Sequence, residues 1–230
     1  MRPQKVAWKG RIMKKNISKR EQTRQMTILA MFIAIVAVLG LVPNGLGGTL
    51  GFIKISPTLE ATIIHIPVLI GAALLGRKFG IYLGLAFGVI SNIAAFIYGS
   101  PLFLYPWVAI LPRLIFGLII FDVTKFFVKF TKNKLIGTSI SFFVLTFIHT
   151  IMVLTMMFTS YSMVMGTGVW SEDIVSYIAL LIFVNVPIAS VIEMIAAAII
   201  GGIIVVRLSN YLKNDDNSSY SEGMTNEDSD

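Results

Sequence analysis

The sequence predicts an all-α integral membrane protein with six transmembrane helices and both termini in the cytoplasm. Its 230 residues are 56% hydrophobic and only 13% charged. The mean hydropathy of +0.81 is typical of a membrane chain. The apolar residues gather in runs long enough to cross a bilayer, and most basic residues lie between the runs or before the first one.

The distribution of the basic residues predicts the orientation. With six spans, seventeen of the nineteen Lys and Arg fall on one side, and Lys54 alone falls on the other. The positive-inside rule then places both termini in the cytoplasm. Nucleic-acid binding is disfavoured, because no soluble domain offers a basic face. The chain has no cysteine, which excludes disulfides and thiolate metal sites.

The chain begins with a basic leader, residues 1–25, which is expected to be a solvated cytoplasmic tail beside anionic headgroups. The apolar run 26–42 is predicted to be the first span and not a signal peptide, because it is long and lacks an Ala-x-Ala exit. Ala30, Ala34 and Ala37 place small side chains on one face, which allows another helix to approach closely.

Residues 43–57 are rich in glycine but match no phosphate-binding motif. They are predicted to be a flexible connection that can fold back as a lid over a cavity. The remaining five spans are expected at about 58–76, 79–98, 104–123, 135–158 and 173–207, within a membrane domain of residues 26–208. Gly80, Gly84 and Gly88 recur every four residues and predict a face for close helix packing. The acidic tail, residues 209–230, is expected to be disordered.

Arg113 lies inside the predicted fourth span, about ten residues from either end. An arginine near the bilayer centre costs at least about 2.5–3.5 kcal/mol, so it normally faces protein, water or an anionic group. Two interpretations remain open, and they can coexist in one pocket. Arg113 forms an ion pair with another intramembrane residue, or it binds an anionic solute.

Glu193, in the predicted sixth span, is the candidate partner of Arg113. Arg113 precedes Lys125 by twelve residues and Glu193 precedes Arg207 by fourteen, which gives depths of roughly 18 and 21 Å from the cytoplasmic ends. The hypothesis is that Glu193 holds Arg113 from below while its remaining donors face a ligand. Asn185 and Trp107 are expected to line the same cavity.

The sequence offers no catalytic motif. It lacks the Gly-x-Ser-x-Gly elbow of a serine hydrolase, an HExxH helix, and clustered carboxylates. The two histidines, His65 and His149, are interpreted as helix-packing hydrogen bonders or as pocket donors. No nucleotide motif is present. The chain is therefore predicted to bind a solute without being an enzyme or pumping the solute unaided.

Several stretches together resemble the substrate-binding S components of energy-coupling factor (ECF) transporters, across most of residues 26–208. They are Ala30-x-x-x-Ala34, the stretch Gly51-Phe-Ile-Lys-Ile-Ser-Pro-Thr-Leu-Glu-Ala-Thr-Ile-Ile-His-Ile-Pro67, the stretch from Leu75 through Gly84 to Gly88, and Leu111-Pro-Arg-Leu-Ile-Phe-Gly117. No single motif is decisive, but their order and spacing make the resemblance fairly specific.

The resemblance implies a multi-pass subunit of the bacterial cell membrane that captures a small water-soluble vitamin from outside. It implies docking on a transmembrane coupling protein through Ala30, Ala34 and Ala37, and two cytoplasmic ATPases that use ATP. The chain itself is expected to carry no cofactor and no metal, and to contact membrane lipid but no nucleic acid. In the family, the first loop caps a pocket at the outer side of helices four to six.

Arg113 favours pantothenate as the vitamin, because a carboxylate stabilises a buried guanidinium. Pyridoxine, hydroxymethylpyrimidine or another small vitamin are the alternatives. A self-sufficient secondary transporter, or a structural subunit of another membrane complex, also stays open, although no inverted repeat is evident. The residues predicted to bind substrate are Asn44, His65, Tyr105, Trp107, Arg113, His149, Asn185 and Glu193.

Overall fold

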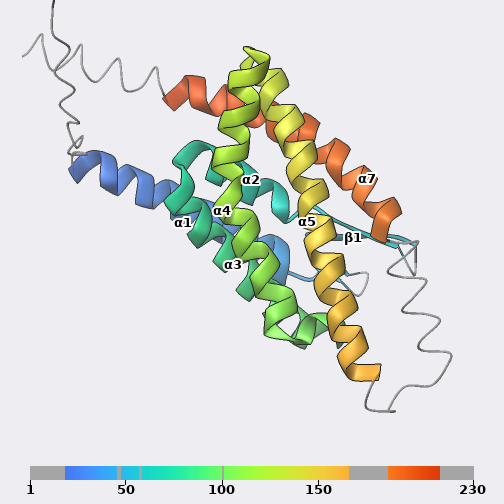
Figure 1. Ribbon diagram of the computed structural model, residues 1–230. Coiled ribbons are helices and arrows are strands. Elements are labelled where there is room, and N and C mark those ends of the chain that lie inside the picture. Colours follow the sequence, from blue (N-terminus) through green and yellow to red (C-terminus); the bar gives the residue numbers. More distant parts are fainter. Residues whose placement is uncertain (1–18, 46–47, 57–58, 100, 166–185, 213–230) are drawn as a thin grey trace, which may run out of the picture.

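The computed structural model describes residues 19–45, 48–56, 59–99, 101–165 and 186–212. In these residues the protein is a helical assembly with one short β-hairpin (Figure 1). The long helices are α1 (Lys19–Leu41), α3 (Arg77–Tyr98), α4 (Pro106–Thr131) and α5 (Lys134–Met165). The shorter elements are β1 (Phe52–Ser56), β2 (Leu59–Thr62), α2 (His65–Leu75), the 3-10 turn η1 (Pro101–Leu104) and α7 (Val186–Ala196).

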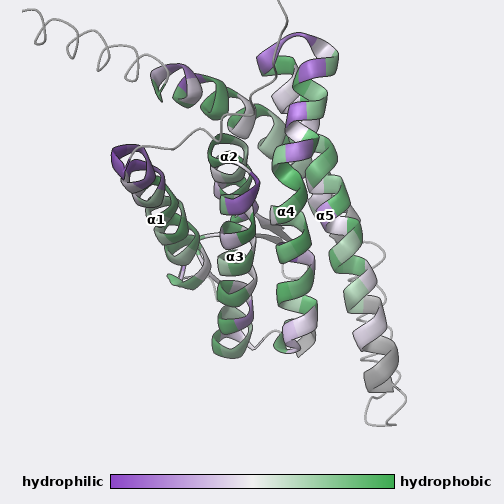
Figure 2. Ribbon diagram, turned by 60° about the vertical axis from the view of Figure 1, so that its left-hand side comes forward, coloured by the Kyte–Doolittle hydropathy of each residue, from purple (hydrophilic) through white to green (hydrophobic). Residues whose placement is uncertain are grey.

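Five described segments are long and apolar enough to cross a membrane. They are Lys19–Leu41, Arg77–Tyr98, Pro106–Thr131, Lys134–Met157 and Ala189–Leu212, and α2 is a shorter apolar helix. Hydrophobic residues cover most of the long helices, and hydrophilic residues gather at the start of α1 and around the α4–α5 connection (Figure 2). The protein is therefore a multi-pass membrane protein with polar helix ends.

The prediction of a second helix over residues 58–76 is wrong at its start, because the helix begins only at His65. Residues 52–56 and 59–62 instead form two antiparallel strands, so the described fold is not purely α. The cause is visible in the sequence, where apolar and polar residues alternate from Ile53 to Ser56, the period of a strand. The predicted connection 43–57 thus contains strand β1 and, before it, a folded turn.

Glycine brings α3 and α4 together so closely that their backbones touch. Side chains added at Gly80 or Gly84 would collide with the backbone of α4 at Gly117 and Arg113. A Cβ at Gly88 would lie 2.7 Å from the Cα of Ile110, inside any acceptable contact. The four-residue glycine repeat is thus a helix-packing face, as the sequence predicted.

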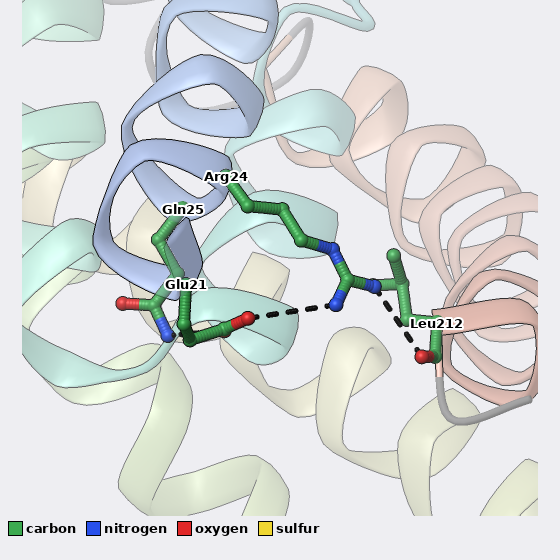
Figure 3. A network of polar contacts seen from close by, with 4 residues as sticks. All are labelled: Glu21, Arg24, Gln25 and Leu212. Atoms are coloured by element: carbon green, nitrogen blue, oxygen red, sulfur yellow. Dashed lines mark hydrogen bonds and ion pairs between the residues drawn. The ribbon is translucent and has the colours of Figure 1, made fainter. Parts of the chain in front are cut away.

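The last described helix contains an irregular turn. After α7 the chain forms the π-helical turn η3 (Ala197–Gly201) and then continues as a helix to Leu212. Near its end, Arg24 of α1 donates a hydrogen bond to the carbonyl of Leu212 at 3.3 Å and pairs with Glu21 at 3.5 Å (Figure 3). Helix α1 and the C-terminal helix are therefore joined at one end.

Other predicted boundaries shift at helix ends. Helix α1 starts at Lys19, so its first turns lie within the predicted leader 1–25. Helix α4 extends to Thr131 and α5 to Met165, beyond the expected ends at 123 and 158. The expected start of the sixth span at residue 173 lies outside the described residues, as do most of the leader and nearly all of the acidic tail.

Candidate ligand-binding site

The membrane-embedded core contains a group of buried polar side chains with incomplete hydrogen bonding. We call it the Arg113 cluster: Arg113 of α4, His65 of α2, His149 of α5 and Glu193 of α7, with the rings of Phe87, Phe103 and Phe116. Four helices supply its polar members. Each of the four polar residues is less than a tenth exposed.

The local sequence explains how Arg113 is held. In an α-helix the carbonyl of Val108 would accept the N–H of residue 112, but Pro112 has no N–H. The Nη1 of Arg113 donates to this free carbonyl at 2.7 Å. The side chain of Arg113 is thus directed back along its own helix, and one of its guanidinium donors has a hydrogen-bond partner.

The rest of the guanidinium faces aromatic rings. Its central carbon lies 5.0 Å from the centroid of Phe103 and 5.6 Å from that of Phe87, distances at which a cation is attracted to a ring. The Nε atom of Arg113 is buried and has no hydrogen-bond partner among the described residues. A buried donor without a partner costs free energy, so the Nε–H of Arg113 is available to donate a hydrogen bond to an additional acceptor.

The two histidines lie next to each other in the same cluster. Their ring centroids are 6.3 Å apart, and the two ring planes are nearly parallel. The ring of His149 also packs 4.7 Å from Phe116. Both nitrogens of His65 and the Nε2 of His149 are buried and make no hydrogen bond in the described part of the chain, although the backbone of Thr62 lies near His65. These polar atoms add to the unused hydrogen-bonding capacity around Arg113.

The predicted direct pairing of Arg113 with Glu193 is wrong for this structure. The described residues show no ion pair between the two side chains. Glu193 instead accepts a hydrogen bond from the backbone N–H of Thr62 at 2.6 Å. The two charges are still close enough to attract each other. The depth estimate from the sequence could not reveal that the hairpin supplies a donor to Glu193.

Three other predicted binding residues have different surroundings. The side chain of Asn44 donates to the carbonyls of Thr49 and Phe52 at 2.9 and 3.1 Å, so it organises the turn before β1. Trp107 is 47% exposed, packs on Tyr105 and donates to Ser160 at 3.2 Å. Asn185 lies outside the described residues. Their predicted binding roles remain untested.

The alanines predicted for docking divide into two groups. Ala30 and Ala34 are exposed on α1, whereas Ala37 is half-buried and packs against the core. Thr23 and Thr27, on the same exposed face, return their hydroxyls to their own helix at 3.0 Å. The exposed side of α1 thus carries small side chains, flanked by the larger exposed side chains of Met26 and Met31.

Sequence reasoning missed the three phenylalanines of the Arg113 cluster, which we call the aromatic wall, and the contact that supports them. Phe87, Phe103 and Phe116 looked like ordinary core residues in an apolar chain. Asn92 of α3 donates to the carbonyls of Phe103 and Leu104 at 2.9 and 3.2 Å, which fixes the turn η1 that carries Phe103. The only available signal was an asparagine within an apolar helix, since such residues are costly in a membrane.

Comparison with known proteins defines the class. The family model described as "ECF transporter, substrate-specific component" matches residues 24–209, nearly the whole described structure. The chain belongs to this family. It is thus a transporter component of the bacterial cell membrane and not a member of an enzyme family.

Two curated relatives narrow the similarity. The chain is 31% identical over 214 residues to the pantothenic acid transporter PanT of Lactococcus lactis subsp. cremoris (strain MG1363), covering 85% of this chain and 99% of that protein. It is 32% identical over 123 residues to the pantothenate transporter PanT of Leuconostoc mesenteroides subsp. mesenteroides, covering 50% of this chain and 56% of that protein.

Proposed function

We propose that this chain is the pantothenate-binding S component of an ECF-type importer. The buried Arg113, with a free Nε and no carboxylate in direct contact within the described residues, carries the proposal. Pantothenate has one carboxylate, which pairs favourably with a guanidinium through charge-assisted hydrogen bonds. The names of the two relatives support the same ligand.

The rest of the Arg113 cluster suits the rest of such a molecule. Pantothenate also has an amide, two hydroxyl groups and a dimethyl-substituted carbon. The unpartnered nitrogens of His65 and His149 offer hydrogen bonds to the amide and hydroxyls, because a neutral imidazole has one donor and one acceptor. The rings of Phe87 and Phe116 offer apolar contact. Arg113 and the histidines are thus proposed as the main ligand contacts.

The ligand can be identified directly. The full-length protein is purified from cells without added vitamin, and small molecules released on denaturation are measured by mass spectrometry. We expect pantothenate, and we expect the emptied protein to bind radiolabelled pantothenate in preference to pyridoxine and hydroxymethylpyrimidine. Selective recovery of pyridoxine or hydroxymethylpyrimidine would replace pantothenate with the alternative vitamin.

We further propose that the membrane domain, residues 26–208, crosses the bilayer six times with both termini in the cytoplasm. Polar contacts gather the ends of several helices: Arg77 pairs with Asp122 at 3.4 Å, and Lys134 hydrogen-bonds Ser209. The basic residues at these ends suit the inner leaflet. Helix α2 is roughly 17 Å long, about half a hydrocarbon core, so the hairpin completes its crossing.

Uptake is proposed to need a coupling protein and two ATPases that use ATP, with Ala30 and Ala34 as the docking face. Ala34→Trp should leave pantothenate binding intact and abolish uptake and copurification with the coupling protein, because a bulky side chain prevents close helix approach. Val89→Trp, on an exposed part of α3, is the control and should not affect assembly. Normal uptake by the Ala34 variant would remove this docking face and favour a self-sufficient transporter.

A further inference from the structure

The hydrogen bond between Glu193 and Thr62 joins the hairpin to a helix 131 residues away in the chain. At 2.6 Å it is a short contact, as expected for an N–H that donates to a carboxylate. Glu193 is 8% exposed, so little water competes for the carboxylate. The bond lies at the end of β2, three residues before His65 of the Arg113 cluster.

The register of the hairpin shows why this N–H is available. Thr62 is opposite Phe52, and the N–H of the next residue, Ile63, donates to the carbonyl of Gly51 at 2.9 Å. This pattern makes Phe52 and Thr62 a non-hydrogen-bonded pair, whose own N–H and C=O groups point away from the partner strand. The N–H of Thr62 therefore lies on the outer edge of the hairpin.

Side chains occupy both outer edges of this pair. Asn44 donates to the carbonyl of Phe52 on one edge at 3.1 Å, and Glu193 accepts from Thr62 on the other at 2.6 Å. Asn44 lies only eight residues before Phe52 in the chain, whereas Glu193 belongs to the distant helix α7. A two-stranded hairpin is marginally stable by itself and needs outside contacts. Glu193 ties the end of strand β2 to helix α7, while the N–H of Gly51, just before β1, donates to the carbonyl of Leu39 in α1 at 2.7 Å.

The carboxyl group of Glu193 is engaged by the hairpin, because its Oε1 accepts the N–H of Thr62. Glu193 is near enough to attract Arg113 but uses its hydrogen bond on the hairpin.

We propose that Glu193 is a positioning residue that fastens the base of the β1–β2 hairpin next to the Arg113 cluster and thereby slows escape of the bound vitamin. This role rests on the proposed binding function and differs from the ligand contact first expected for Glu193. The hairpin ends directly before His65, so loosening its base also displaces a member of the cluster.

Two variants of the full-length protein separate positioning from contact. Glu193→Ala removes the acceptor, whereas Glu193→Gln keeps an amide oxygen for Thr62 but removes the charge. Hydrogen exchange of ligand-free protein is measured in peptides covering Leu59–Ile66, and dissociation of radiolabelled pantothenate is measured in the same preparations. Thermal unfolding verifies that each variant is folded.

For Glu193→Ala we expect exchange of the Thr62 amide and the pantothenate dissociation rate to rise about tenfold each, the loss expected for one hydrogen bond to a charged group. For Glu193→Gln both should stay within about threefold of the wild type, because a neutral hydrogen bond remains. Equal dissociation rates in the two variants, with unchanged hairpin exchange, would overturn positioning and indicate a direct contact. Unchanged behaviour of Glu193→Ala would also overturn it. Should the wild type not bind pantothenate, the proposed ligand fails while the exchange result still tests the fastening.

Discussion

Helix α4 takes part in two regions with opposite properties. Along its contact with α3, glycines leave no space for even one added carbon atom, and backbone lies against backbone. At the Arg113 cluster, several buried polar atoms have no hydrogen-bond partner in the part of the chain that the structure describes. The two regions meet at residue 113, whose carbonyl faces Gly84 while its side chain enters the cluster. The closely packed α3–α4 pair thus fixes the backbone position of Arg113, whose side chain has incomplete hydrogen bonding.

The difference teaches where each kind of stabilisation is used. Close packing between helices gives stability within a membrane, where burial of apolar surface gives little advantage over lipid. Unsatisfied polar groups lower stability, so a protein retains them where a ligand restores their hydrogen bonds. Substitutions in the first region should damage folding, and substitutions in the second should damage binding.

The largest effect is expected for Gly84→Leu. The Cβ would lie 3.0 Å from the Cα of Gly117 and closer still to the carbonyl of Arg113, and neither backbone can move aside. We expect a loss of about 3 kcal/mol or more, at the upper end of overpacking, and a low yield of monodisperse protein in thermal unfolding and gel filtration. Leu85→Ile, on the exposed face of α3, should stay within about 0.5 kcal/mol. Equal stability of the two variants would contradict the close packing of α3 and α4.

The second effect concerns Arg113→Met, which should fold but lose pantothenate affinity by about a hundredfold, because a charge-assisted contact is removed. The change relieves the desolvation cost of a buried charge but leaves the Val108 carbonyl without its donor, so we expect stability to change by no more than about 2 kcal/mol. The matched control is Arg77→Met, whose pair with Asp122 is more than half exposed and contributes little. An Arg113→Met protein that does not fold would instead assign the arginine a structural role.

The smallest effect is expected where the aromatic wall is supported. Asn92→Ala removes the two hydrogen bonds that hold η1, so Phe103 becomes less well placed beside the guanidinium. We expect affinity to fall about threefold to fivefold and stability by about 1 kcal/mol. Thr155→Val removes an exposed hydroxyl bond within α5 and should change neither quantity in binding and unfolding assays. An unaffected Asn92→Ala variant would show that η1 is held by other contacts.

The sequence predicted features that depend on local pattern. Apolar runs located the long helices, and the glycine repeat located the α3–α4 contact, because both follow from helical periodicity. Arg113 stood out, since a single charge within an apolar run is costly. These signals need no knowledge of which helices are neighbours.

The features that were missed depend on contacts between distant residues. Glu193 was paired with Arg113 from depth alone, but the outward N–H of Thr62 could be found only from the hairpin register. Strand β1 was taken for part of a flexible connection and strand β2 for a helix start, although the alternation Ile53-Lys-Ile-Ser56 is a strand pattern. Three phenylalanines became a wall around the guanidinium only once the helices were placed.

The π-helical turn Ala197–Gly201 has a consequence for changes in chain length. Such a turn closes hydrogen bonds over five residues instead of four, so it contains one residue more than a regular helix needs. A single-residue deletion there would leave an ordinary α-helix with both flanking faces in register. The same deletion within α3 would rotate everything after it by about 100° and turn the glycine face away from α4. In the described membrane domain, the C-terminal helix is therefore where a deletion is best tolerated.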